Sequence, residues 1–210
     1  MKKSITFDGY TIVSCGTLRG EIEHLRTEGF FNNIEKILYT TPGLHEKQRE
    51  LEKQLTWQIE NAKKYSDRII VVYGERCFLD PANYSRNIDK LIHEIGSDIS
   101  RIQARTCIDM LASAEEREKI HAGRKVYWLT PGWIKYWKII FSDWDNSMAN
   151  ETFPANDVAI VLDGINAFNT MMEKSPEDIL EFSDWMKLEI EPYKISLNRF
   201  KKLFLKQLRI

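Results

Sequence analysis

Short apolar runs alternate with helical patterns along nearly the whole chain, and this alternation limits the fold more than any other feature of the sequence. The runs with the length and composition of strands comprise 11–14, 34–40, 69–73, 99–104, 125–129, 158–162 and 192–196. Between them, apolar residues recur every three or four positions, as in amphipathic helices. This order is typical of an α/β protein with a mostly parallel, doubly wound, Rossmann-like sheet and helices on both faces.

The chain has 210 residues and 43% hydrophobic residues, enough to form the core of a large domain. We therefore expect residues 1–210 to form a single α/β domain. The segment 141–157 has no clear period, which makes it the candidate for a long loop, with a possible subdivision near 142–157. Asp80-Pro81-Ala82 has the composition of a helix start, and we expect that helix to run to Gly96.

The charge balance of the chain argues against several classes of partner. The 30 lysines and arginines are matched by 31 acidic residues, so no basic excess favours a nucleic-acid partner. No run approaches the roughly 18 to 20 apolar residues that a membrane span needs, and the first residues do not resemble a secretory signal. Three cysteines without an export signal predict a cytoplasmic protein with free or metal-bound thiols.

Four potential metal ligands follow successive strand-like runs. Cys15 follows the first run, His45 the second, Cys77 the third and Cys107 the fourth. Ligands of open parallel sheets collect beyond the carboxyl ends of the strands, so these four side chains are expected at one edge of the sheet. Three thiolates and an imidazole suit a tetrahedral zinc ion. The same soft donors also suit copper(I) or an iron–sulfur cluster.

The same four residues also suit roles other than metal binding. Free cysteines are among the most buried residue types, so the three thiols can be ordinary core residues. His45 can instead cap a helix or face solvent. Neighbouring strands lie about 4.8 Å apart, so their loops must fold inward before the side chains can share one ion. Cys77 and His45 would also suit a nucleophile and base, although nothing local in the sequence activates either.

A second set of residues is predicted to bind an organic ligand beside the thiols. These candidates follow strand ends or belong to the aromatic segment after residue 127: Gly16, Tyr73, Gly74, Thr130, Trp133, Trp144 and Asp163. Trp133, Trp137 and Phe141 have the spacing of a helix core stripe, and the alternative is an aromatic wall for a planar or cationic ligand. Asp163 either binds a ligand hydroxyl or caps a turn.

Five short elements carry a resemblance to a known family. They are SCGTL at 14–18, LH at 44–45, YGERC at 73–77, CIDML at 107–111 and LTPGW at 129–133. With them the chain resembles, over nearly its whole length, an uncharacterised domain-of-unknown-function family of bacterial and archaeal α/β proteins. Members are often encoded near corrinoid proteins and their methyltransferases, which implies a role in one-carbon metabolism. Many relatives have the cysteine closer to Tyr-Gly, whereas Glu75-Arg76 intervene here.

The residues and the resemblance together lead to one functional expectation and one alternative. The expectation is a zinc-binding protein that supports corrinoid-linked or thiol methyl transfer, with a small-molecule substrate or a corrinoid protein as its partner. A zinc ion with one open position can make a bound thiol nucleophilic at neutral pH. The alternative is an accessory protein that binds a ligand or a partner without chemistry of its own, and whose cysteines are merely buried.

Overall fold

The computed structural model describes residues 6–208, and it confirms the expected parallel α/β class. The first sheet has the order β2-β1-β3-β4, and all of its pairs are parallel. Its strands are β1 (Tyr10–Ser14), β2 (Lys36–Tyr39), β3 (Arg68–Val72) and β4 (Ile99–Arg101). β1 and β3 are central and carry the most continuous apolar runs, as strands covered on both faces do.

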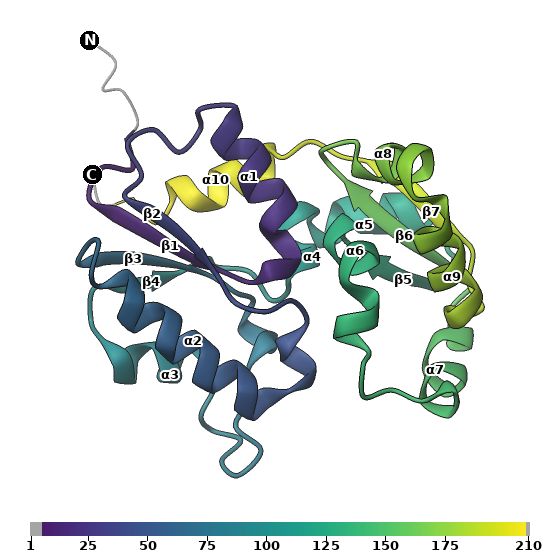
Figure 1. The fold of residues 1–210 in the computed structure, drawn as a ribbon, viewed down its shortest axis with the longest axis horizontal. Coiled ribbons are helices and arrows are strands. Elements are labelled where there is room, and N and C mark those ends of the chain that lie inside the picture. The colour runs from purple at the N-terminus through teal and green to yellow at the C-terminus, as the bar shows by residue number, and fades with distance from the viewer. Residues whose placement is uncertain (1–5, 209–210) are drawn as a thin grey trace.

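The remaining strands form a second parallel sheet with the order β5-β6-β7. These strands are β5 (Val126–Leu129), β6 (Val158–Asp163) and β7 (Ile190–Lys194). The two sheets lie in separate halves of the molecule (Figure 1). The chain therefore changes sheet between β4 and β5, and the segment 142–157 lies within the second half.

Helices cover both faces of the first sheet. On one face, α1 (Arg19–Thr27), α4 (Cys107–Leu111) and α10 (Asn198–Leu205) pack against Ile12, Ile70 and Val72. On the other face, α2 (Gln48–Ala62) and α3 (Ile88–Ile95) pack against Val13, Ile69 and Val71. α10 is close to the end of the chain yet lies beside α1 (Figure 1), where Phe204 meets Phe31 with ring centroids 4.9 Å apart. The last helix thus returns to the first half.

The second sheet has its own aromatic core. It lies among α6 (Pro131–Ile140), α7 (Asn146–Thr152), α8 (Ala167–Lys174) and α9 (Pro176–Met186). The remaining helical segments are α5 (Ala114–His121) and the short turns η1 (Gly16–Leu18), η2 (Leu44–Glu46), η3 (Glu75–Cys77) and η4 (Phe153–Ala155). Among the helices of residues 6–208, none is both long and apolar enough to span a membrane.

Two local expectations are corrected by the structure. The segment 80–86 forms turns rather than the start of a helix, and α3 begins only after Asn87, whose side chain accepts a hydrogen bond from Lys90 N–H at 3.1 Å. That cap satisfies a free N–H of the first turn and sets the start of the helix. The segment 141–157 is not a plain loop, because Asp145 caps α7 through Met148 N–H at 2.9 Å and η4 follows directly.

Candidate functional site

A cavity of about 460 Å³ lies beyond the strand ends of the first sheet, where the second half approaches. We call it the cysteine pocket. It is lined by His45, Glu46, Arg76, Cys77, Arg105, Thr106, Cys107, Ile108, Asp109, Arg117, Tyr127, Trp128 and Trp133. Two of the three cysteines, the predicted histidine and one predicted tryptophan therefore share a single cavity, whose size is in the range of small-molecule sites.

Two loops that hydrogen-bond to each other bring Cys77 and Cys107 into this pocket. Glu75 N–H donates to Ala104 O at 2.9 Å, and Arg76 N–H donates to Arg105 O at 2.9 Å. This contact needs a residue without a side chain, because a Cβ at Gly74 would stand 2.5 Å from Arg105 O. Gly74 therefore serves the close approach of two backbones.

The buried Arg101, on β4, hydrogen-bonds to the backbone that leads into the same two loops. The Arg101 guanidinium donates to the backbone carbonyls of Tyr73 at 3.2 Å, Ile102 at 2.7 Å and Ala104 at 3.2 Å. Its charge is paired with Asp89 through two hydrogen bonds of 2.6 and 3.0 Å. Arg101 thus fixes the backbone just before each of the two cysteines, and its positive charge favours the thiolate of Cys77.

Cys15 ends β1 and lies deeper in the molecule than the other two cysteines. Its N–H donates to Val72 O at 3.3 Å, which continues the pairing of β1 with β3. Its Sγ lies 3.0 Å from Thr17 Oγ1. The hydroxyl of the buried Tyr73 makes a short hydrogen bond with Thr40 Oγ1 and also reaches the Cys15 thiol. Cys15 is therefore enclosed by hydroxyl groups.

The three thiols are close enough to affect one another electrostatically. Burial raises the pKa of Cys77 to about 12, and the charge of Cys15 adds to this shift. Burial also raises the pKa of Cys107, and the charges of Cys77 and Cys15 contribute. The Trp133 indole acts in the opposite direction by hydrogen bonding to the Cys107 thiol. In this state Cys77 and Cys107 are neutral thiols, which can ionise when a cation displaces their protons.

His45 also lines the pocket and contacts Trp133. Its ring centroid is 5.1 Å from that of Trp133, and its Nε2 lies 3.3 Å from Glu46 Oε1. This hydrogen bond lowers the pKa of Glu46. Within residues 6–208, no three His, Cys, Asp or Glu side chains stand in an arrangement that could hold a metal ion. Cys77 and Cys107 share the pocket whereas Cys15 does not line it, and no ligand shell is preassembled among the described residues.

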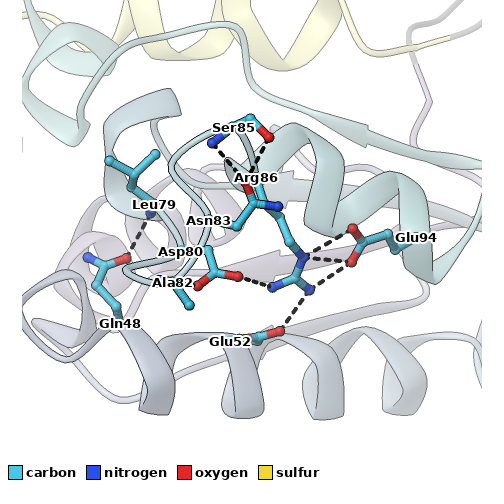
Figure 2. Close-up of polar contacts among 9 residues, drawn as sticks. All are labelled: Gln48, Glu52, Leu79, Asp80, Ala82, Asn83, Ser85, Arg86 and Glu94. Carbon is cyan, nitrogen blue, oxygen red and sulfur yellow. Dashed lines mark hydrogen bonds and ion pairs between the residues drawn. The ribbon is translucent and has the colours of Figure 1, made fainter.

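The loop after Cys77 is fastened to two helices by a cluster around Arg86 (Figure 2). The Arg86 guanidinium contacts Glu52 on α2 at 2.7 Å, Glu94 on α3 at 2.7 Å and Asp80 in the loop at 3.4 Å. The adjacent Gln48 accepts a hydrogen bond from Leu79 N–H at 2.9 Å and donates one to Cys77 O at 3.3 Å. The Arg86 cluster and Gln48 together position the carboxyl side of Cys77.

The other predicted ligand residues lie around the pocket or away from it. A Cβ at Gly16 would stand 2.5 Å from Thr40 O, so Gly16 packs against β2. Asp163 accepts three backbone N–H groups at the start of α8, at 2.9 to 3.1 Å, which makes it a cap of that helix. Trp144 does not line the pocket and packs against Phe141 and Phe153 in the core of the second half.

Two buried polar groups lie where the halves meet. Thr130 is fully buried and its Oγ1 has no hydrogen-bond partner among the described residues. Glu21 on α1 is also fully buried, and neither carboxyl oxygen has a hydrogen-bond partner on another described residue. Burial and the charge of Asp163 raise the pKa of Glu21 to about 8, while a hydrogen bond to its own backbone acts in the opposite direction. Glu21 is therefore predominantly neutral at pH 7 and adds little charge near Cys107.

Sequence reasoning missed three residues that shape the site: Arg101, Arg86 and Glu21. Arg101 lies on a weak strand whose alternation gave no reason to bury a charge. Arg86 was missed because the sequence predicted a helix, and not a loop, over the segment that contains it. For Glu21 a signal existed, because it lies three residues after Leu18 and beside Ile22, at the margin of the apolar stripe of α1.

Comparison with known proteins agrees with the resemblance noted from the short elements. No curated protein and no solved structure matches the chain. One family model does match, over residues 39–204, and it is described as "Protein of unknown function (DUF1638)". The match includes His45, Cys77 and Cys107 and begins after Cys15. It covers most of the chain, from β2 to α10, and we conclude that the chain belongs to this DUF1638 family.

Proposed function

We propose that a soft metal ion, zinc in the first instance, binds at the cysteine pocket through the thiolates of Cys77 and Cys107, which line it, and of Cys15, which lies deeper in the molecule. The observation that carries this proposal is that Cys77 and Cys107 line one pocket, and that the charge of Cys15 helps to raise the pKa of both. Thiolates are the donors that zinc prefers, and binding displaces the protons that the free thiols hold. Because no ligand shell is preassembled, the thiols must rotate toward one another when the ion binds.

The substrate would enter from the open side of the pocket and supply a further ligand, with His45 as the competing candidate. Bound zinc would lower the pKa of a substrate thiol and make it a nucleophile at neutral pH. We therefore propose a role in thiol or corrinoid-linked methyl transfer by a cytoplasmic protein, which agrees with the genomic setting of the family it resembles. Arg76 and Arg105 line the pocket as exposed side chains, and they favour a substrate with a negative charge.

Metal content measured on the intact chain, purified without chelators, tests this proposal. We expect about one equivalent of zinc per chain, and each of the variants Cys15→Ser, Cys77→Ser and Cys107→Ser should weaken zinc binding by about a hundredfold or more. His45→Ala should weaken it only if the imidazole is the fourth ligand. Less than about a tenth of an equivalent of any transition metal, together with weak zinc binding on titration, would rule the proposal out.

A second function is favoured by the aromatic lining of the same pocket. Trp128, Trp133 and Tyr127 border the cavity, and they suit a planar organic ligand held without metal. In that case the protein would be an accessory module and its cysteines would be structural. The alkylation rates of the three thiols separate the two functions: zinc should protect Cys15, Cys77 and Cys107 together, whereas the accessory function predicts slow alkylation that zinc does not change.

A further inference from the structure

A second cavity, of about 720 Å³, lies on a different side of α4 from the cysteine pocket, and no residue lines both. We call it the basic groove. It runs between the α4–α5 connection, the end of β7 and α10. Its lining comprises Leu111, Ala112, Ser113, Glu116, Lys119, Ile120, Tyr193, Lys194, Ile195, Ser196, Asn198, Arg199, Lys202, Leu203 and Lys206. Neither the thiols nor the proposed metal site uses this space.

The groove concentrates positive charge from three separate elements. Lys119 comes from α5, Lys194 from β7, and Arg199, Lys202 and Lys206 from α10 and the residue after it. None of the four lysines forms an ion pair with another residue in the described part of the chain. The whole chain carries a net charge of -1, so this excess is local.

The one carboxylate in the lining is already engaged. Glu116 accepts a hydrogen bond from Ser113 N–H at 2.6 Å, and Glu116 N–H donates to Ser113 Oγ, which together form the capping box of α5. Glu115 does not line the groove; hydrogen bonds from its own backbone and from the Ser113 side chain lower its pKa, and the positive charge of Arg199 contributes. Among the lining residues one carboxylate thus faces five cations, and the mutual repulsion of the cations is not balanced by the groove's own acidic groups.

The two faces of α10 differ in the way their lysines are paired. Lys201 points away from the groove and forms an ion pair with Glu28 at 2.8 Å. Its neighbour Lys202 lines the groove without a carboxylate partner among the described residues. Arg199 is fixed, because its Nε donates to Asp109 O at 2.7 Å. The groove therefore combines one anchored guanidinium with lysines that are free to rearrange around a ligand.

We propose that the basic groove binds a small anionic molecule that carries two or more phosphate groups. Several charges are needed because the cations are distributed over three elements, and lysine and arginine are the usual partners of phosphate oxygens. The volume matches that of ordinary ligand sites. Ile120 and Ile195, which are partly exposed, offer an apolar surface to the part of the ligand without charge. Such a ligand would join β7 of the second half to α10, which packs on the first.

Calorimetric titration of the intact chain with inorganic tripolyphosphate, at constant ionic strength, tests the proposal. We expect one saturable site, and weaker binding of pyrophosphate and then of orthophosphate. The double variant Lys194→Glu/Lys202→Glu should weaken binding by about tenfold or more. The control Lys53→Glu/Lys174→Glu makes the same change of net charge at exposed positions outside the groove and should remain within about twofold of the natural chain.

Several outcomes would overturn the proposal. These are the lack of saturable binding in the natural chain, equal losses in the groove variant and in the control, and tighter binding of a single-stranded oligonucleotide than of tripolyphosphate. A melting temperature close to that of the natural chain shows that the groove variant is folded. Should the groove variant unfold, the single variants Lys119→Gln and Lys206→Gln, which remove less charge, take its place with the same criterion.

Discussion

Gly132, at the start of α6, lies so close to Thr17 in η1 that a Cβ at position 132 would stand 1.9 Å from the Thr17 carbonyl oxygen. This contact joins the TPGW element of the second half to the CGTL element of the first. It also places Trp133 against the cysteine pocket, where it meets His45 and Cys107. Two of the short elements that carry the family resemblance thus meet between the halves, beside the cysteine pocket.

Gly132→Ala should therefore destabilise the chain. The added methyl group meets backbone atoms that cannot rotate away, and we expect a loss of about 2–3 kcal/mol in the free energy of unfolding. Urea denaturation measures this loss. Gly20→Ala is the matched control, because Gly20 lies in α1 and its Cβ would meet only the flexible end of Ile165 at 3.1 Å. An equal loss of unfolding free energy in both variants would contradict the view that the close contact between Gly132 and Thr17 excludes a side chain at position 132.

Arg101 provides a second prediction about stability. Arg101→Ala removes one donor from each of the carbonyls of Tyr73, Ile102 and Ala104. The Ile102 and Ala104 carbonyls keep a backbone N–H donor whereas the buried Tyr73 carbonyl loses its side-chain donor, and we expect a loss of about 2 kcal/mol. Because the same carbonyls hold the two loops, zinc binding should weaken as well. The control Arg124→Ala breaks an ion pair with Glu191 that is about 40% exposed on both sides, and it should cost less than about 1 kcal/mol. Thermal denaturation and a zinc titration check both effects.

The raised pKa of Glu21 predicts that the free energy of unfolding depends on pH. This pKa is about 8 in the folded chain against 4.5 for the ordinary carboxyl, so between these values the native state holds one proton more than the unfolded state. The contribution of Glu21 to stability therefore falls as pH rises, by up to about 1.4 kcal/mol per pH unit, and levels off above pH 8.

Glu21→Gln removes this dependence. The variant should gain stability relative to the natural chain as pH rises from 5 to 8, by about 1.4 kcal/mol per unit at most. Urea denaturation at several pH values measures the difference between the two proteins. Glu151→Gln, at an exposed position on α7, should show a difference that is independent of pH. A pH-independent difference for Glu21→Gln would contradict the burial of an uncharged carboxyl.

Arg86 links the loop at 78–87 to the reactivity of Cys77. Arg86→Met removes the contacts with Glu52, Glu94 and Asp80, so the loop should open more often and Cys77 should be alkylated faster while Cys107 changes little. Mass spectrometry after timed alkylation measures each rate. Arg26→Met breaks an exposed ion pair with Glu23 within α1 and serves as control. Equal acceleration of Cys77 and Cys107 would indicate general unfolding instead.

The fold class was predictable because strand and helix patterns alternate along the chain, whereas the division into two sheets was not. β4 pairs only with β3 and β5 pairs only with β6, so each is an edge strand. The apolar pattern of a strand does not tell which strand lies beside it. The chain passes from the first sheet to the second through α4 and α5. This division depends on tertiary packing and not on the local sequence pattern.

For the pocket, the sequence predicted some of the side chains that line it and missed the residues that support them. The strand-end rule predicted that Cys15, His45, Cys77 and Cys107 would lie at one edge of the sheet; His45, Cys77 and Cys107 line one pocket, and Cys15 does not line it. It could not predict that Arg101 holds both loops, since that depends on carbonyls from β3 and β4 that are distant in sequence. For Glu21 the pattern was ambiguous, because a long side chain at the margin of an apolar stripe usually reaches solvent.

The most direct test of the account is a titration of the metal-free chain with cobalt(II), which takes the place of zinc and reports thiolate ligands through its charge-transfer absorption. The account predicts saturation at about one equivalent, with an intensity that corresponds to three thiolates. Cys15→Ser, Cys77→Ser and Cys107→Ser should each lower that intensity by about a third. A chain that shows no such band, or a band that Cys15→Ser leaves unchanged, would contradict the claim that the three thiols form one site.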